Sequence, residues 1–328
     1  MSLDFVVLTG FLGSGKTTLL RDFLPSPDAA DTAVIVNEAG EVGLDGAILR
    51  ETGAGVPMAT LSNGCVCCQM GNDLQITVDA LLWAPRPPGA GPLRRIVLET
   101  SGLSKPGPVL RQLAGSLDGR PPEHRMRVSV VATYDAVRGT DTAAFAEAAA
   151  QWAAAHRVVV TKADLAGPDR LRTAVGEVQA LNPLAELVAD ADRTAAVAAA
   201  FAPLAGGPVH EPLPGAGSAH PRVSVSLLRP TGPMDYDDLA AWLDNLAGAL
   251  GERLLRVKGL VRVAGQARPV LVQSVGTLFS PPRLFGGEME TAPFLVVIAR
   301  DASPAELEVA PAGLFRCAPR TERLRRAD

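Results

Sequence analysis

The stretch Gly10-Phe-Leu-Gly-Ser-Gly-Lys-Thr-Thr18 directly follows a short apolar run at residues 5–8. It fits the pattern G-x-x-x-x-G-K-[ST], in which a glycine-rich loop joins a strand to a helix. Backbone N–H groups of such a loop surround phosphate oxygens, while Lys16 reaches the β- and γ-phosphates and Thr17 coordinates Mg²⁺. A chance glycine-rich turn is the alternative. The apolar strand before the loop and the helical segment after it favour a nucleotide site.

Four more short runs rich in β-branched residues follow, at residues 33–36, 95–98, 128–131 and 157–160. Segments of helical character lie between them, at residues 17–24, 74–83 and 142–155. Strands that alternate with helices and are apolar on both faces are typical of a doubly wound, mostly parallel sheet. The sequence therefore predicts an α/β fold of the P-loop NTPase type for roughly the first two hundred residues.

A change of composition at residues 204–221, where Gly, Pro and Ala predominate, indicates a linker. We expect a nucleotide-binding domain over 1–205, the linker over 206–222 and a smaller α+β domain over 223–328. The second domain should hold strands at 223–228, 254–263, 270–278 and 294–299, with a helix at 236–250. A last helix is expected to begin after Ser303, a good N-cap, with Pro304 at its first position.

The strand at 95–98 ends in Glu99-Thr-Ser-Gly102. Ligands of parallel α/β sheets bind at the carboxyl ends of the strands. Glu99 is therefore expected to hold the Mg²⁺ shell or a water molecule, and the Gly102 N–H to reach the γ-phosphate. A helix-capping carboxylate is the alternative for Glu99. Since no side chain is an evident general base, intrinsic turnover should be slow.

Thr161-Lys162-Ala163-Asp164 follows the run at 157–160 and matches the [NT]-K-x-D element that recognises guanine. The Asp164 carboxylate can accept hydrogen bonds from guanine N1–H and N2–H₂, whereas adenine would leave it facing a lone pair. Such a mismatch at a comparable site costs about 10⁴-fold in selectivity. A solvated charge pair is the alternative, but the position after a later strand of the same sheet predicts GTP rather than ATP.

The overall composition excludes several classes of protein. The chain has 328 residues, 47% of them hydrophobic and 20% charged, which favours folded cores over disorder. The net charge of −4 gives no basic footprint for nucleic acid or an anionic membrane surface. No apolar run approaches the ~20 residues of a membrane span, and the start of the chain lacks a basic export signal. We expect a cytoplasmic protein without nucleic-acid or membrane partners.

Three of the four cysteines are crowded at Cys65, Cys67 and Cys68. In a reducing cytosol such a cluster indicates a metal or redox site before a disulfide framework. Thiolates select Zn²⁺, Cu⁺ or similar ions, and a carboxylate such as Glu38 or Glu41 could complete the ligand set. These two glutamates could equally lie near Mg²⁺ or on the surface. A redox thiol group or buried inert cysteines are the alternatives to metal handling.

Together these motifs resemble the CobW-type metallochaperone GTPases, relatives of the hydrogenase and urease nickel-insertion GTPases. The resemblance covers nearly the whole chain. It rests on the phosphate loop, Asn37-Glu-Ala-Gly-Glu-Val-Gly-Leu-Asp45, Gly64-Cys-Val-Cys-Cys68, Glu99-Thr-Ser-Gly-Leu103 with Pro106, Thr161-Lys-Ala-Asp164 and Asn182-Pro-Leu-Ala185, and on Trp242-Leu243, Arg256-Val-Lys-Gly259 and Val272-Gln-Ser-Val275 in the second half.

The resemblance implies that GTP binding is coupled to a Cys-x-Cys-Cys site whose cargo is zinc or cobalt. It also implies that Glu38 belongs to the metal and switch region, that Asn182 lies near the guanine pocket and that residues 223–328 form a CobW-like C-terminal domain. The chain departs from the family at Ala39, where an aromatic residue is usual. It also departs at Ser104-Lys105, where a small-acidic pair is common, and it lacks the His-rich segment that many members carry.

The sequence thus predicts a GTP-dependent metallochaperone that binds Zn²⁺ or Co²⁺, hydrolyses GTP to GDP and passes the metal to a client metalloprotein or cofactor-synthesis enzyme. The alternatives are a P-loop kinase or ATPase acting on a small metabolite, a nucleotide-gated metal buffer or sensor without a client, and a thiol-redox regulator. A homodimer that forms in a nucleotide-dependent way is a further possibility. The residues expected to act are Lys16, Glu99 and Gly102 in catalysis; Gly10, Gly13, Ser14, Gly15, Lys16, Thr17, Thr18, Thr161, Lys162, Asp164 and Asn182 at the nucleotide; Cys65, Cys67, Cys68 and Glu38 at the transition metal; and Thr17 and Glu99 at Mg²⁺.

Overall fold

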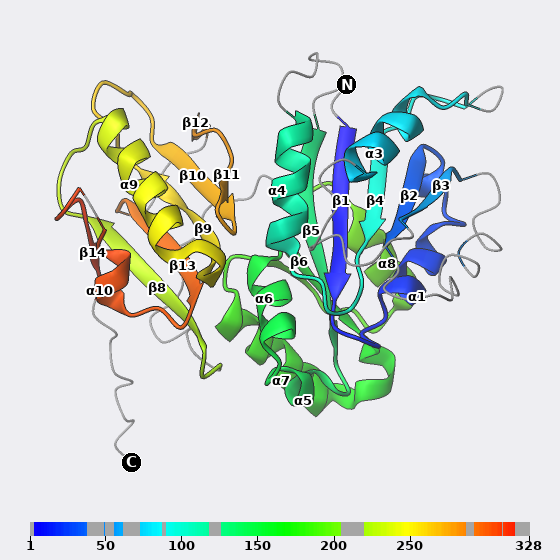
Figure 1. Cartoon of the computed structure of the whole chain (residues 1–328). Coiled ribbons are helices and arrows are strands. Elements are labelled where there is room, and N and C mark those ends of the chain that lie inside the picture. Colours follow the sequence, from blue (N-terminus) through cyan, green and yellow to red (C-terminus); the bar gives the residue numbers. More distant parts are fainter. Residues whose placement is uncertain are drawn as a thin grey trace. The chain divides into compact units, whose positions relative to one another are not determined.

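The computed structural model describes residues 3–37, 49, 56–61, 73–86, 90–117, 126–204, 220–286, 292–309 and 311–318. The chain divides into two compact units (Figure 1). One comprises Met1–Gly176 with Ala185–Leu204, and the other comprises Glu177–Leu184 with Ala205–Asp328. Within the described ranges, no helix has both the length and the apolar character needed to cross a membrane.

The first unit is built on a parallel sheet. In the part of the chain that the structure describes, its strands lie in the order β3-β2-β4-β1-β5-β6-β7, and each neighbouring pair is parallel. The strands are β1 Leu3–Gly10, β2 Thr32–Asn37, β3 Met58–Leu61, β4 Arg95–Glu99, β5 Met126–Asp135, β6 Arg157–Thr161 and β7 Glu186–Val188. All five strands predicted in this half are present, and β1 lies at the centre of the order.

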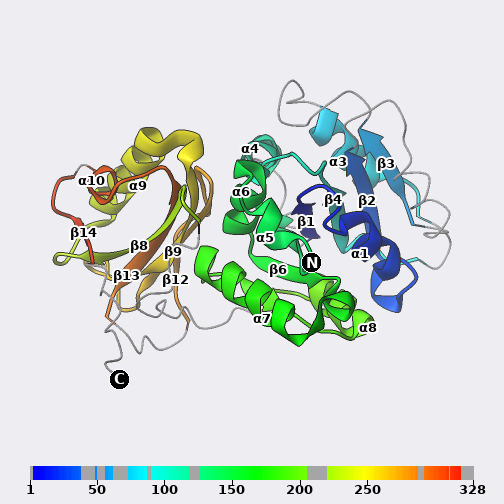
Figure 2. The same ribbon diagram turned by 90° about the horizontal axis from the view of Figure 1, so that it is seen from below.

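Helices cover both faces of this sheet, as the view in Figure 2 shows. They are α1 Lys16–Phe23, α3 Asp73–Trp83, α4 Pro106–Leu117, α5 Gly139–Thr142, α6 Ala146–Ala154, α7 Ala163–Leu181 and α8 Arg193–Phe201, with a short 3₁₀ turn at Pro27–Ala29. On one face, α1 and α8 pack together through Phe23 and Phe201, whose ring centroids are 4.2 Å apart. The doubly wound α/β architecture is confirmed.

The Ala-rich segment 142–155, predicted as one helical stretch, is instead split. Helix α5 ends at Thr142 and α6 begins at Ala146. Between them Phe145 adopts an extended conformation, with φ −82° and ψ 128°, as the N-cap of α6. Its ring stacks on Phe11 of the glycine-rich loop with centroids 4.9 Å apart. The break in the helix thus coincides with a long-range aromatic contact that the local sequence does not show.

The second unit holds an antiparallel sheet, with strand order β11-β10-β9-β13-β8-β14 among the described residues and β12 paired to β10. Its elements are β8 Val223–Pro230, α9 Tyr236–Leu250, β9 Leu254–Val261, β10 Val270–Val275, β11 Leu278–Phe279, β12 Arg283–Leu284, β13 Phe294–Arg300, α10 Pro304–Leu307 and β14 Phe315–Cys317, with a 3₁₀ turn at Gly251–Arg253. The predicted single strand over 270–278 is wrong, because the chain reverses at Gly276 and pairs Val275 with Leu278.

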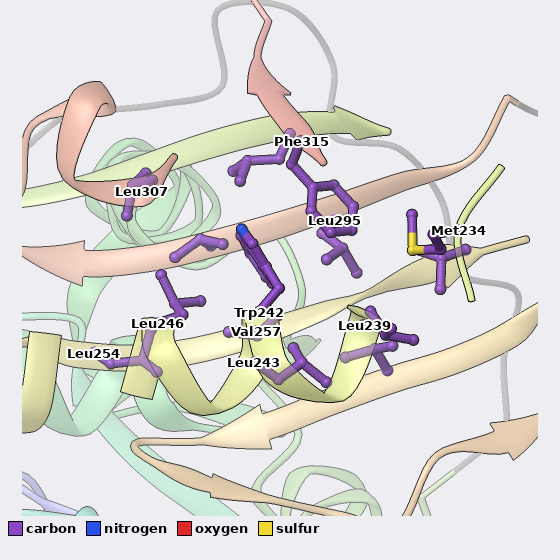
Figure 3. Packing of buried hydrophobic residues seen from close by; sticks show 14 of the residues in the cluster. Met234, Leu239, Trp242, Leu243, Leu246, Leu254, Val257, Leu295, Leu307 and Phe315 are labelled. Atoms are coloured by element: carbon purple, nitrogen blue, oxygen red, sulfur yellow. The ribbon is translucent and has the colours of Figure 1, made fainter. Parts of the chain in front are cut away.

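The core of this second unit lies between α9 and the sheet (Figure 3). Trp242 of α9 is fully buried, and its ring lies 4.4 Å from that of Phe315 between centroids. Leu239, Leu243 and Leu246 continue the apolar face of the helix at the spacing that the 3.6-residue period requires. This face of the helix is buried against an antiparallel sheet, which confirms the predicted smaller α+β domain.

Candidate nucleotide site

The glycine-rich loop joins the carboxyl end of β1 to the first turn of α1. Gly10 lies so close to β5 that a Cβ atom there would be 2.1 Å from the hydroxyl oxygen of Thr133, so a larger residue cannot occupy this position. Thr133 Oγ1 in turn lies 2.6 Å from Ser14 Oγ. The adjacent strand β5 therefore holds the loop in shape, and the N-terminus of α1 follows the loop.

Lys16, in the first turn of α1, is buried, and its ammonium lies within the curve of the loop. Its Nζ donates hydrogen bonds to the carbonyl oxygens of Gly10, at 2.7 Å, and Phe11, at 3.2 Å. Thr18, two residues further along α1, is exposed. A buried cation at a helix N-terminus, surrounded by loop amides, provides the charge that a polyphosphate requires.

Thr17 and Glu99 form a pair of oxygen ligands. The Thr17 hydroxyl donates a 2.6 Å hydrogen bond to Glu99 Oε1, which lies at the end of β4 in register with Leu8 of β1. Because the hydroxyl gives its hydrogen to the carboxylate, its remaining lone pairs are available to a cation. Hard oxygen donors, few in number and beside a phosphate loop, suit Mg²⁺, which keeps several waters and takes its other ligands from the nucleotide. The residues present fit this ion.

The segment Thr161–Asp164 contacts the same loop. The Thr161 hydroxyl bonds the Ser14 carbonyl oxygen at 2.7 Å, and Lys162 Nζ donates to the Gly13 carbonyl oxygen at 3.0 Å. Lys162 has a φ of 57°, an uncommon conformation for a residue with a Cβ. Such backbone strain persists where several contacts fix a residue, and it concentrates at functional sites. The two sequence motifs, almost 150 residues apart, thus meet in space.

Asp135 is a further member of this group that the sequence analysis did not single out. Its Oδ2 lies 2.5 Å from Lys162 Nζ, and its Oδ1 accepts hydrogen bonds from the backbone N–H groups of Val137 and Arg138 at 2.8 and 3.1 Å. The carboxylate is almost fully buried at the carboxyl end of β5. Its position at a strand end is the one signal that could have pointed to it.

Gly102 lies against the loop from the other side. A Cβ atom at Gly102 would come within 2.8 Å of the Leu12 backbone nitrogen and 2.5 Å of the Leu12 side chain, so only glycine allows this approach. The preceding Thr100 is fixed to β1, since its N–H donates to the Leu8 carbonyl oxygen at 2.9 Å. The loop after β4 is therefore in direct contact with the glycine-rich loop.

The two remaining residues of the predicted guanine site differ in their surroundings. Asp164 is exposed in the first turn of α7, next to Lys162. Asn182 is buried, its Oδ1 accepts a hydrogen bond from the Leu184 N–H at 3.1 Å, and it belongs to the segment that groups with the second unit. The role of Asn182 at the base stays a prediction.

The predicted transition-metal ligands Cys65, Cys67, Cys68 and Glu38 lie outside the described residues. Within the described part of the chain, no group of three or more His, Cys, Asp or Glu side chains could hold a metal ion. The strands that lead to the predicted ligands are nevertheless defined. β2 ends at Asn37 and β3 at Leu61, and these two residues pair in parallel register. On its other side β2 pairs Val36 with Glu99 of β4.

A glycine-rich loop between a central parallel strand and a helix, with a lysine inside it, a Thr–Glu oxygen pair and a Thr-Lys-x-Asp segment against it, defines the class of P-loop nucleotide-binding proteins. Comparison with known families gives a closer assignment. Residues 4–189 match the CobW/HypB/UreG nucleotide-binding domain, and residues 223–313 match the cobalamin synthesis protein cobW C-terminal domain. The chain belongs to the CobW family of nucleotide-binding proteins.

Characterised relatives span nearly the full chain. The zinc chaperone YjiA of Escherichia coli is 29% identical, over 94% of this chain and 97% of its own. The zinc chaperone CobW of Pseudomonas aeruginosa is 30% identical, over 84% of this chain and 81% of its own. The crystal structure of Zn(II)-bound YjiA GTPase aligns with a TM-score of 0.65 over 96% of this chain and 99% of that one, at 22% identity, which supports the fold.

Proposed function

We propose that the chain is a GTPase that binds zinc at Cys65, Cys67, Cys68 and Glu38 in its GTP-bound state and releases it to a client metalloprotein after hydrolysis. GTPase activity is supported by membership of the CobW family and by the likeness to YjiA GTPase. Zinc as cargo is supported by the relatives named zinc chaperones, three of which match most of this chain.

The arrangement of three neighbouring strand ends supports the coupling between the nucleotide site and the predicted metal site. Asn37 of β2 pairs with Leu61 of β3, and Val36 pairs with Glu99 of β4. Adjacent strands are about 4.8 Å apart. Glu38 is the next residue after Asn37, and Cys65 follows Leu61 by four residues, a span of at most ~14 Å. The strand ends that precede the predicted metal ligands therefore adjoin the end of β4, which carries the predicted Mg²⁺ ligand.

In this proposal the chain's own residues divide the work. Lys16 and the loop amides bind the phosphates, and the Thr17–Glu99 pair holds Mg²⁺, which neutralises charge on the β- and γ-phosphates. Asp164 selects guanine over adenine, and Gly102 responds to the γ-phosphate. Loss of the γ-phosphate contacts after hydrolysis loosens residues 38–45, 65–68 and 99–103, so the thiolate site opens. This is an order-to-disorder switch of the kind that GTPases use.

A metal-release experiment tests the proposal. The protein is loaded with one equivalent of Zn²⁺ and GTP, Mg²⁺ is added to start hydrolysis, and zinc transfer to the chromogenic chelator 4-(2-pyridylazo)resorcinol is followed. We expect transfer to keep pace with phosphate release, and to be at least tenfold slower with a non-hydrolysable GTP analogue. A Lys16→Ala variant, unable to bind nucleotide, should release zinc at one rate in all conditions. Equal rates with GTP and the analogue in the wild-type protein would contradict a hydrolysis-driven release.

A further inference from the structure

The loop after β4 folds into a tight turn on the glycine-rich loop. Ser104 N donates to the Ser101 carbonyl oxygen at 3.1 Å, and the two serine hydroxyl oxygens lie 2.8 Å apart. Gly102, inside this turn, touches Leu12 so closely that a Cβ atom would collide with its backbone nitrogen. The turn 101–104 therefore lies directly against the glycine-rich loop.

One side chain from another element holds this turn. Gln151 of α6 is fully buried, and its Nε2 donates to the carbonyl oxygens of Gly102, at 3.0 Å, and Ser104, at 2.9 Å. Both partners are acceptors, so only the NH₂ end of the amide, with its two hydrogens, can face them. In the described part of the chain, these are the hydrogen bonds that join residues 101–104 to a different helix or strand.

Helix α6 is itself fixed to the phosphate-binding region. Phe145 at its N-cap stacks on Phe11, and Trp152 Nε1 donates to the Thr133 carbonyl oxygen at 3.0 Å. Thr133 is the residue whose hydroxyl meets Ser14. Gln151 lies between these two attachments on the same helix. The position of the turn is thus set by a helix that contacts the glycine-rich loop through Phe145 and is bonded through Trp152 to β5, the strand that holds the loop.

We propose that Gln151 is a positioning residue for the γ-phosphate: its amide holds Gly102 where the N–H meets the third phosphate, and so it gives the site its preference for GTP over GDP. This inference rests on the proposed function, in which residues 99–103 respond to GTP. GDP has no group that reaches the turn, so GDP affinity does not depend on Gln151. Preorganising the turn lowers the ordering cost that GTP would otherwise meet on binding.

The test compares GDP and a non-hydrolysable GTP analogue in wild-type protein and in Gln151→Met, which keeps the side-chain volume but removes both donors. We expect GTP-analogue affinity to fall about tenfold, the effect of losing a net hydrogen-bond contribution, with GDP affinity unchanged within twofold. Gln151→Asn retains an amide one carbon shorter and should show a smaller loss in the same direction. If Gln151→Met does not fold, Gln151→Asn is used for the same comparison of affinities.

A destabilised control separates positioning from stability. Val197→Ala opens a cavity under α8, away from the turn, and should leave the ratio of the two affinities unchanged. Parallel loss of GDP and GTP-analogue affinity in Gln151→Met, or an unchanged ratio, would overturn the inference. Hydrogen–deuterium exchange of wild-type residues 99–105 with each nucleotide tests the proposed function separately: equal exchange would refute the switch itself, whatever the variants do.

Discussion

Lys162 occupies a strained conformation that its neighbours maintain. A left-handed φ costs a residue with a Cβ about 1–2 kcal/mol. Its ammonium bonds the Gly13 carbonyl oxygen and the Asp135 carboxylate, while the adjacent Thr161 hydroxyl bonds Ser14. Asp135 is fixed in turn by two backbone N–H groups. The buried carboxylate therefore determines where the lysine lies, and the lysine joins the base-recognition segment to the phosphate loop.

Asp135→Asn tests this chain of contacts. The amide keeps the shape and an acceptor for Val137 and Arg138 but loses the charge that attracts Lys162. We expect affinity for GDP and for a GTP analogue to fall together by about 1–2 kcal/mol, roughly five- to thirtyfold, measured by titration of a fluorescent nucleotide. Asp169→Asn, which breaks an exposed Asp–Arg pair in the same domain, is the control and should change neither affinity. Unaltered affinities in Asp135→Asn would remove the carboxylate from the site.

At the scale of single residues, the sequence predicts the site residues that lie within one short motif and misses those that lie outside any motif. Lys16, Thr17 and Lys162 belong to short sequence motifs that are enough to predict their chemistry. Asp135 and Gln151 belong to no such motif. Asp135 becomes visible only when β5 and β6 are known to be neighbours, and Gln151 only when α6 is known to face the turn after β4. Partners set by topology cannot be read from local patterns.

At the scale of elements, helix ends show which local signals were sufficient. Ser303 and Pro304 predicted the start of α10, and the structure has the full capping box, with Glu306 Oε2 accepting from the Ser303 N–H and hydroxyl at 2.9 Å. Arg253 adds an ion pair to the same carboxylate at 2.9 Å. By contrast, the break before α6 lies where Phe145 stacks on Phe11, a tertiary contact that the helix propensity of the surrounding alanines does not predict.

The capping box predicts that the stability of the second domain falls in acid. The Ser303 backbone N–H, then the Arg253 guanidinium and the Ser303 hydroxyl, lower the pKa of Glu306 from 4.5 to about 2. Because the pKa is depressed in the folded state, the stabilisation is complete above pH ~4.5 and is lost as pH falls towards 2. We expect Glu306→Gln to lower the urea midpoint at neutral pH, with the difference from wild type shrinking across that window.

The matched control for this prediction is Asp244→Asn, which removes an exposed carboxylate from the middle of α9 in the same domain. It should leave the urea midpoint and its pH dependence close to those of the wild-type protein. A difference between wild type and Glu306→Gln that stays constant from pH 7 to pH 2 would contradict a contribution through the charge of the carboxylate.

At the scale of the whole molecule, the chain divides into two compact units, one built on a parallel sheet and the other on an antiparallel sheet. The nucleotide residues described here, apart from Asn182, belong to the parallel unit. In that unit the strand ends at Leu61 and Glu99 flank the end of β2 at Asn37, which supports our proposal that the order of a metal site built there depends on the nucleotide. By thermodynamic reciprocity, zinc must tighten GTP binding by the factor by which GTP tightens zinc binding.

The most direct test of this coupling is a competitive titration of Zn²⁺ and Co²⁺ against a chromophoric chelator, in Mg²⁺ buffer with GDP or a non-hydrolysable GTP analogue. A Cys65/Cys67/Cys68→Ser variant is titrated beside the wild-type protein. We expect metal affinity to be at least tenfold higher with the GTP analogue, a typical allosteric coupling, with no such gain in the serine variant. Equal metal affinities in the two nucleotide states, or a gain that survives the loss of all three thiols, would contradict it.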